Sequence, residues 1–385
     1  MDVPDPPDET PAPTPGPTAL EPFPSPAPPG ARFPELVATP GGGVVLTWMR
    51  GTEDGAALEA AVLEGDAFGA ARTIVEHPDL MVNWADGGSV AIAATHWTAW
   101  WLQRAPGGYH AYVARSDDGE AWSDGVRLHD HDGRGEHGFV VALPDDDGAT
   151  VFAWLDGRAW ADDATPDETM LLTRSMDAAG TLGPETALDE RGCDCCPTSG
   201  TVTDDGAVLA YRDRTVDEVR DMAVVTHDGE GWSEPVVPVE DGWTIDGCPV
   251  NGPSIVSNGP STLLTWLTAA DDQPRVQAVR LNADGAADGP AFIVASGRSV
   301  IGRVDSLLRD DGGALITWVA RDGSDSLLRA RWLLPDDTLG DPFDVSPLPP
   351  GSGTGTPRIL DTPEGILVAW TAPTDPATVE LGLIR

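Results

Sequence analysis

Short apolar runs that end in an aromatic residue recur along this chain roughly every 50 residues, which is the pattern of an internal repeat. In the long gap after the first run, SVAIAATH ends at His96 and supplies a seventh copy. Turns rich in Asp and Gly follow a further apolar run in each unit, as at residues 116–122 and 226–232. Apolar runs bounded by Gly, Asp and Pro predict short strands and tight turns. The six aromatic ends are Trp48, Trp154, Tyr211, Trp266, Trp318 and Trp370.

The repeat length predicts the fold. A unit of about 50 residues with four short strands is typical of a β-propeller blade. We therefore predict an all-β, seven-bladed β-propeller that forms one domain over residues 31–385, with six blades as the alternative. The last unit stops after its third strand, so residues 18–26 are expected to supply the outer strand and close the ring. The terminal aromatic side chains are expected to pack between blades.

The first 30 residues differ from the rest, because they contain 12 Pro and little apolar periodicity. This composition predicts a stiff, acidic tether over residues 1–30. Met1 runs directly into Asp2 without a signal peptide. Because such tethers often follow export or lipid-anchor signals, we expect a periplasmic, lipid-anchored or secreted protein whose signal is absent from this sequence. The cytoplasm is the alternative.

The charge of the chain limits its partners. Acidic residues outnumber basic ones by 63 to 23, every basic residue is Arg, and the formal net charge is −40. This balance excludes nucleic acid and disfavours anionic membrane surfaces. No apolar run reaches the roughly 18 residues that a transmembrane segment needs. We expect a monomer whose partners are a metal ion and, in addition, a small anionic molecule or a sugar.

Several segments resemble those of known propellers. SDDGEAW at 116–122 and THDGEGW at 226–232 resemble the Asp-box, or BNR repeat, of sialidase-like β-propeller proteins. ARFPELVATPGG at 31–42 resembles the Arg-x-Pro opening strand of sialidases. A narrower resemblance, to a bacterial sialidase-like group with a Cys-x-Cys-Cys-Pro motif, rests on RGCDCCPTSG at 191–200, EHGF at 136–139 and DGCPVNGP at 246–253. The resemblance implies a propeller fold and no particular activity for the narrower group.

The sialidase resemblance also implies a site for a substrate carboxylate. Arg32 matches the first arginine of that family, and Arg303 and Arg358 begin the first strands of units six and seven, where they could join it. Arg158 and Arg212, on loops, could contact an anionic ligand as well. Ion pairing with nearby carboxylates is the alternative for these arginines. None of the three tyrosines lies in a recognisable nucleophile context beside a Glu, so sialidase-type hydrolysis is an alternative function.

Propeller topology predicts a second gathering of residues. The connections between consecutive blades emerge on one face, and they carry His137 and all four cysteines, Cys193, Cys195, Cys196 and Cys248. His96 is expected to open a long loop, residues 95–110, on the same face. His129 and His131 are one residue apart and point to the same side of an extended segment, which by itself is a weak metal signal.

Two chemistries fit the cysteines. Disulfides are one, but a scheme that uses all four cysteines needs a bridge within residues 193–196, which we expect to be sterically awkward. A single bridge to Cys248 is reasonable, but it leaves two thiols over. A metal site is the other, because thiolates with imidazole form a soft ligand set that selects copper, with zinc as competitor. We expect Cys195, Cys196, Cys248 and His137 as ligands, followed by Cys193 and His96. The carboxylates of Glu136, Asp194 and Asp246 are candidates to orient them, and simple solvation is their alternative.

These observations predict an extracytoplasmic, copper-binding β-propeller with a Cys/His site at one mouth of its channel. Whether it catalyses a reaction stays open. The alternatives are a sialidase-like glycoside hydrolase that uses the three arginines, and a non-catalytic propeller that binds a glycan or protein and has structural disulfides.

Overall fold

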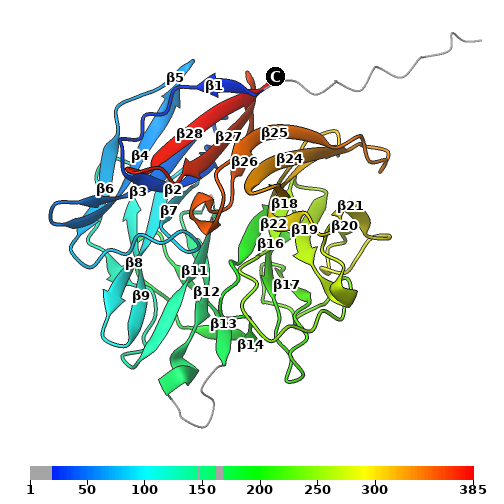
Figure 1. The fold of residues 1–385 in the computed structure, drawn as a ribbon. Coiled ribbons are helices and arrows are strands. Elements are labelled where there is room, and N and C mark those ends of the chain that lie inside the picture. Colours follow the sequence, from blue (N-terminus) through cyan, green and yellow to red (C-terminus); the bar gives the residue numbers. More distant parts are fainter. Residues whose placement is uncertain (1–19, 146, 162–167) are drawn as a thin grey trace, which may run out of the picture.

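The computed structural model describes residues 20–145, 147–161 and 168–385, and over these residues the chain is an all-β protein arranged as a β-propeller (Figure 1). Antiparallel meanders follow one another around a common centre. The all-β propeller prediction is therefore confirmed. Residues 1–19 of the predicted tether lie outside the described residues. Among the residues described, no helix is long and apolar enough to cross a membrane.

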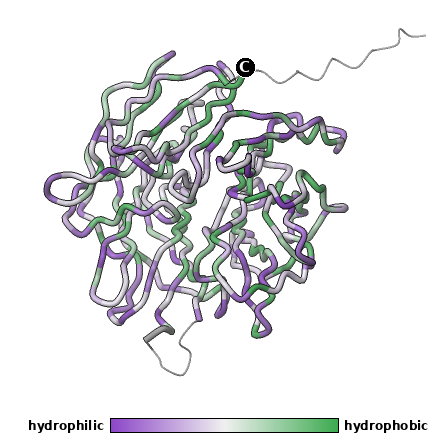
Figure 2. Tube along the Cα trace, viewed as in Figure 1, coloured by the Kyte–Doolittle hydropathy of each residue, from purple (hydrophilic) through white to green (hydrophobic). Residues whose placement is uncertain are grey.

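The strands follow the sequence repeat. The first three units contain β2 (Ala31–Ala38), β3 (Val44–Thr52), β4 (Gly55–Glu64), β5 (Ala67–Phe68) and β6 (Arg72–His77), then β7 (Ser89–Ile92), β8 (Trp97–Ala105), β9 (Gly108–Ser116) and β10 (Val126–Arg127), then β11 (Gly135–Pro144), β12 (Thr150–Asp156), β13 (Thr169–Met176) and β14 (Thr186–Gly192). Strands such as β3 and β4 have unbroken runs of buried positions, so both of their faces lie in the core, and Figure 2 shows hydrophobic residues in green along the strands.

The remaining units are built in the same way. They contain β15 (Ser199–Thr203), β16 (Gly206–Arg212) and β17 (Met222–His227), then β18 (Ser254–Ser257), β19 (Thr262–Thr268), β20 (Arg275–Leu281) and β21 (Phe292–Ser296), then β22 (Val300–Leu308), β23 (Ala314–Asp322), β24 (Asp325–Leu333) and β25 (Phe343–Leu348), then β26 (Arg358–Thr362), β27 (Gly365–Ala372) and β28 (Thr378–Ile384). Three short 3-10 turns interrupt the described strands, namely η1 (Arg158–Ala161), η2 (Ala270–Asp272) and η3 (Ser352–Thr354).

The prediction of seven separate blades is not matched by the hydrogen bonding, because the described strands form six sheets. Units two and three share one eight-stranded sheet, since β9 and β11 pair in parallel through Gly108↔Gly135 and Tyr109↔Glu136. The six sheets are not six equal blades either, because the sheet of β15–β17 has three strands. The first strands of the units, β2, β7, β11, β15, β18, β22 and β26, contact one another in a closed ring around the centre.

The ring closes through the N-terminal segment, as predicted. β1 (Glu21–Phe23) pairs antiparallel with β28 through Glu21↔Leu383 and Phe23↔Leu381. The last sheet therefore has the order β1-β28-β27-β26. The N-terminal strand covers an edge of β28 that would otherwise present unpaired backbone groups.

The terminal aromatics form the core between sheets, as predicted. Trp48, Trp154, Trp266 and Trp318 are among the largest fully buried side chains. A buried indole N–H requires an acceptor, and three of these tryptophans find a carboxylate. The partners are Glu59 for Trp48 at 2.7 Å, Asp156 for Trp154 at 2.8 Å and Asp241 for Trp266 at 2.7 Å.

Unit two differs from its prediction. His96 does not end the aromatic-bearing strand, because the run before it forms β7, the first strand of the unit. The second strand is β8, in which Trp101 is buried in the position that His96 was expected to hold. Apolar runs on both strands of this unit made the first look like the second. The segment expected to be a long loop is instead the β8–β9 hairpin.

Candidate metal centre and central cavity

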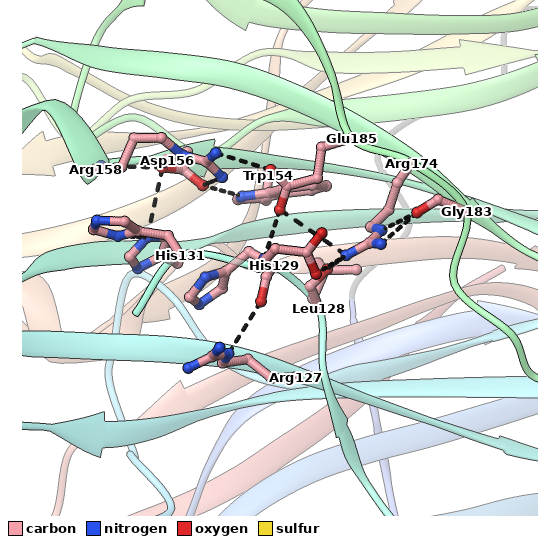
Figure 3. Close-up of polar contacts among 12 residues, drawn as sticks. Arg127, Leu128, His129, His131, Trp154, Asp156, Arg158, Arg174, Gly183 and Glu185 are labelled. Atoms are coloured by element: carbon pink, nitrogen blue, oxygen red, sulfur yellow. Dashed lines mark hydrogen bonds and ion pairs between the residues drawn. The ribbon is translucent and has the colours of Figure 1, made fainter. Parts of the chain in front are cut away.

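Four histidines gather where units two and three meet. His110 lies on β9, His137 lies on β11, and His129 and His131 lie in the segment between β10 and β11. One ring nitrogen from each of His110, His129 and His137 falls within 4.8 Å of the others. His131 joins them, with its Nδ1 3.2 Å from Nε2 of His137. Figure 3 shows His129 and His131 close to the pair of Asp156 and Arg158.

Glycines allow the two strands that carry this cluster to approach each other. A Cβ atom on Gly108 would overlap the carbonyl oxygen of Gly135, its partner in the parallel β9–β11 pairing. A Cβ atom on Gly135 would lie 2.7 Å from the carbonyl oxygen of Gly157 and 3.1 Å from the His137 ring. Only glycine tolerates such close contact of backbones. The pairing that joins the two units therefore also brings His110 and His137 together.

The centre of the cluster is buried and contains polar atoms without protein partners. His129 is 1% exposed and His137 is 0% exposed. The two rings stack with centres 3.6 Å apart and planes inclined by 6°. Neither ring nitrogen of His129 has a hydrogen-bond partner. A buried polar group without a partner costs roughly 1–3 kcal/mol, so the two ring nitrogens of His129 carry a cost that a bound ligand would remove.

Burial keeps these imidazoles neutral. Burial and the neighbouring His137 lower the pKa of His129 to about 2. Burial also lowers the pKa of His137 to about 4, against the opposing effect of Asp156. The pKa of His110 is lowered as well, first by burial and then by Arg127. A neutral imidazole has a free lone pair on one ring nitrogen, which is the form that binds metal ions.

A fixed carboxylate borders the cluster. Oδ1 of Asp156 lies 3.5 Å from Nε2 of His137. Arg158 holds both oxygens of Asp156, at 2.7 and 2.8 Å, and Trp154 donates its indole N–H to Oδ2 (Figure 3). Burial of Asp156 opposes its ionisation, but Arg158, His137 and Trp154 outweigh it and lower its pKa. Because Arg158 fixes the position of the Asp156 carboxylate, this carboxylate is placed to orient the His137 ring.

The cysteines form a separate cluster. Cys195 and Cys248 form a disulfide, with Cα atoms 6.0 Å apart, so in this state neither offers a thiolate to a metal. Cys193 and Cys196 are free and buried, with sulfurs 3.3 Å apart. The structure has no bridge within residues 193–196, because the disulfide reaches across to Cys248 and leaves two thiols over.

A hydrogen bond with the Cys196 thiol, with help from nearby arginines, makes Cys193 acidic. Arg220 donates from Nη1 to the sulfur of Cys193 at 3.1 Å. The Cys196 thiol, the Cys195 backbone N–H and Arg220 outweigh burial and lower the pKa of Cys193 to about 6. Burial raises the pKa of Cys196 above its usual value, as does its neighbour Cys193. The two thiols therefore differ in charge state near neutral pH.

The predicted ligand set is divided by the structure. Within the described residues, no group of three or more possible ligands combines cysteine with histidine. His137 lies in the histidine cluster, whereas His96 is buried with Nε2 2.8 Å from Oγ1 of Thr150. Thr150 begins β12 and Asp156 ends it, so His96 lies at the opposite end of that strand from the cluster.

The proposed orienting carboxylates have other roles. Glu136 hydrogen-bonds to the Tyr109 hydroxyl. Asp194 lies beside the Cys195–Cys248 disulfide. Asp246 is exposed. His110 was not predicted as a ligand from the sequence, because residues 95–110 were expected to form a loop. His110, Tyr112 and Ala114 lie two residues apart, which is the spacing of one face of a strand.

A cavity of about 270 Å³ lies at the centre of the ring of first strands, and acidic and basic side chains line it. Arg358 pairs with Glu35 at 2.8 Å. Arg303 lies over the ring of Trp84 at 5.1 Å. Arg32 does not join these two arginines, since it is exposed and borders a different hollow. The predicted arrangement of three arginines is therefore reduced to two at this cavity. The lining carboxyl groups are Glu35, Asp86 and Asp305.

The two loop arginines make internal contacts. Arg158 forms ion pairs with Asp156 and Glu185, which agrees with the predicted alternative of ion pairing with nearby carboxylates. Arg212 is 1% exposed, and it donates to the backbone carbonyls of Arg220, Asn251 and Leu267. Neither guanidinium faces the central cavity.

A tyrosine connects the cavity to the histidine cluster. The hydroxyl of Tyr109 hydrogen-bonds to Asp86, which lines the cavity, and to Glu136. Its backbone carbonyl lies 3.2 Å from Nδ1 of His137. Burial raises the pKa of Asp86 to about 7, against the lowering effect of the Phe139 N–H. The Tyr109 hydroxyl can donate its one proton to only one of the two carboxyl groups, Asp86 or Glu136. The other carboxyl group can hydrogen-bond to the hydroxyl oxygen when it is itself protonated.

Comparisons with known proteins agree on the fold. No protein-family model and no curated sequence matches the chain. The polysaccharide lyase Uly1 has 12% identity to this chain, the alignment covers 94% of this chain and 91% of that one, and the TM-score is 0.51. A PL25 ulvan lyase bound to -[GlcA(1-4)Rha3S]- has 12% identity, coverage of 96% and 94%, and a TM-score of 0.51.

A neuraminidase-like protein from A/bat/Guatemala/164/2009 has 10% identity, coverage of 96% of this chain and 91% of that one, and a TM-score of 0.50. At these identities the likeness concerns the fold alone, which is that of a β-propeller. The assignments of the Asp-box repeats and of the Cys-x-Cys-Cys-Pro motif stay predictions.

Proposed function

We propose that this protein is an extracytoplasmic, metal-binding, seven-bladed β-propeller whose metal centre consists of His110, His129 and His137, with His131 beside them. The closed ring of first strands supports the blade count. The disulfide supports an oxidising compartment outside the cytoplasm. The protein stores, senses or delivers the ion, or uses it in redox chemistry.

A single observation carries the proposal. His129 is buried, and both of its ring nitrogens lack a hydrogen-bond partner, although the imidazoles of His110 and His137 pack against it. A metal ion would give His129 a partner and would use the neutral state that burial enforces. Imidazole ligands suit copper and zinc, and divalent copper binds nitrogen ligands more tightly than zinc does. Copper therefore remains the first choice, now as Cu²⁺ on histidines, with zinc as the alternative.

Metal titration of the chelator-treated protein tests this proposal. We expect one equivalent of Cu²⁺ to bind, with nitrogen hyperfine structure in the electron paramagnetic resonance spectrum. His129→Ala should weaken binding at least 100-fold. His227→Ala, in the outer strand β17, is the matched control and should bind like wild type. A protein that binds neither Cu²⁺ nor Zn²⁺, or whose affinity falls equally in both variants, would overturn the proposal.

A second candidate function rests on the central cavity. Its carboxyl groups include Asp86, whose raised pKa near 7 suits a general acid or base. Arg303 and Arg358 add positive charge, and Trp84 offers a ring on which a sugar could stack. We propose an acidic glycan as the ligand, a class that includes the -[GlcA(1-4)Rha3S]- bound to the ulvan lyase.

A panel of sialosides and uronate-containing polysaccharides tests the second candidate. Lyase activity gives an unsaturated sugar with ultraviolet absorbance, and hydrolysis gives a new reducing end. Activity that Asp86→Asn abolishes and the exposed-site variant Asp79→Asn retains would support it. No binding and no turnover across the panel would reject it.

A further inference from the structure

We infer that the four cysteines form an internal thiol–disulfide exchange centre, in which the disulfide moves between the outer pair, half-buried Cys195 and exposed Cys248, and the buried pair Cys193–Cys196. This inference is independent of the metal centre. It rests on distances and contacts at the segment of residues 193–196, which joins β14 to β15. The two pairs differ in exposure, because Cys248 is exposed whereas Cys193 and Cys196 are each 1% exposed.

The sulfur atoms lie in a sequence suited to stepwise exchange. The sulfur of Cys193 is 3.9 Å from that of Cys195, which already belongs to the disulfide. On its other side it is 3.3 Å from the sulfur of Cys196. Cys193 therefore has a disulfide to attack and a thiol to resolve the product. Thiol–disulfide exchange requires this sequence of an attacking thiolate, a disulfide and a leaving thiolate.

Two arginines favour the thiolate that would attack. Arg220 donates from Nη1 to the sulfur of Cys193 at 3.1 Å, and its Nη2 lies 2.6 Å from Oε2 of Glu218. The backbone N–H of Cys193 is bonded to the carbonyl of Arg212, whose guanidinium is buried and lies over Trp243 at 4.8 Å. Positive charge next to a thiol stabilises its thiolate, and the thiolate is the nucleophile.

The exchange balances without an external oxidant. The Cys193 thiolate attacks Sγ of Cys195, so the Cys193–Cys195 bond forms, the Cys195–Cys248 bond breaks, and Cys248 leaves as a thiolate that takes up a proton. The Cys196 thiol then loses its proton and attacks Sγ of Cys193. The Cys193–Cys196 bond forms and Cys195 leaves as a thiolate. One disulfide and two thiols are present before and after. The product presents a Cys195/Cys248 dithiol at the surface, where a thiol-reactive partner can reach it.

The sequence makes the exchange easy to follow by mass spectrometry. The chain contains no Lys, so trypsin cuts only after Arg. Cys193, Cys195 and Cys196 fall in the peptide of residues 192–212, whereas Cys248 falls in that of residues 221–275. The starting disulfide therefore links two peptides, and both later states have a loop within one peptide.

The experiment incubates the folded, disulfide-bonded protein with N-ethylmaleimide at neutral pH, followed by acid quenching and digestion. The reagent removes the Cys248 thiolate as it forms. We expect the link between the two peptides to disappear with time and alkylated Cys248 to appear. Cys193→Ser should slow this at least tenfold, because the nucleophile is gone. Cys196→Ser keeps the first step, so it should release Cys248 and stop at the Cys193–Cys195 bridge.

Two arginine variants test the same centre while retaining all four thiols. Arg220→Gln removes the contact to Cys193 and should slow the release of Cys248. Arg214→Gln is the matched control, since Arg214 binds the same carboxylate, Glu218. The inference is overturned if the link between the peptides persists in folded wild-type protein, or if Cys193→Ser releases Cys248 as fast as wild type does.

Discussion

The imidazole ring of His129 lies flat against that of His137, with centres 3.6 Å apart and planes inclined by 6°. Both rings are buried, and His129 has no hydrogen-bond partner at either nitrogen. Such an arrangement is costly in a protein that only needs to fold, because an apolar side chain would fill the same space without unpaired polar atoms.

This relationship predicts a trade between stability and binding. We expect His129→Leu to stabilise the metal-free protein by about 1–3 kcal/mol, because it removes two unpaired buried nitrogens. The same variant should lose its metal-dependent gain in stability. Urea unfolding with and without Cu²⁺ measures both effects.

His227→Leu serves as the control for surface histidine loss and should leave the metal-dependent gain intact. If His129→Leu destabilises the metal-free protein instead, then His129 has a structural partner, and its ring nitrogens do not serve as metal ligands.

Metal binding should also be visible as heat stability of the wild type. A ligand that binds only the native state at 100 times its dissociation constant stabilises by about 2.7 kcal/mol. We therefore expect Cu²⁺ to raise the melting temperature in a concentration-dependent way and a chelator to reverse the rise. An equal rise in His110→Ala and wild-type protein would place the ion elsewhere.

Much of the fold could be predicted from the sequence, because the repeat appears in local patterns. Trp48, Trp154, Trp266 and Trp318 are buried and each follows an apolar run, and Gly, Asp or Pro bounds these runs. The pairing of β1 with β28 also followed from a missing outer strand in the last unit. The shared sheet of units two and three could not be predicted in this way, since it depends on the close approach of Gly108 and Gly135, which are far apart in sequence.

The site was predicted less completely. Topology brought His137 to the right junction, but it did not show which of the neighbouring groups would face it. His110 lies in residues 95–110, which we expected to form a loop. The sequence gives only a weak metal-binding signal for His129, because it is the fold that buries its ring against those of His110 and His137. The cysteines were gathered correctly on adjacent connections, yet their partners depended on the distance between Cys195 and Cys248.

The glycine at the β9–β11 junction provides a test of the architecture of the site. A Cβ atom on Gly108 would overlap the Gly135 carbonyl, so we expect Gly108→Ala to separate the two strands and to cost more than about 2 kcal/mol. Because His110 and His137 lie on these strands, the affinity for Cu²⁺ should fall as well. Equilibrium unfolding and metal titration measure the two effects.

Gly51→Ala is the matched control, since a Cβ atom there meets nothing within 4 Å. It should change stability by less than about 1 kcal/mol and leave metal binding unchanged. Wild-type stability in Gly108→Ala would show that β9 and β11 are not held together as described.

The last prediction concerns pH and Asp86, which is 3% exposed and has its pKa raised by burial from 3.8 to about 7. The folded protein therefore holds a proton on Asp86 that the unfolded chain releases near pH 4. The stabilising effect of this proton is complete below pH 4 and is lost as the pH rises through about 7. A difference of about three pKa units corresponds to about 4 kcal/mol.

Asp86→Asn keeps an acceptor for the Phe139 N–H but does not titrate. The stability of Asp86→Asn relative to wild type should therefore rise by up to about 4 kcal/mol between pH 4 and pH 8, measured by urea unfolding at each pH. Asp79→Asn, at an exposed position, should show no such trend. A constant difference between Asp86→Asn and wild type across this range would mean that Asp86 is ionised in the folded protein.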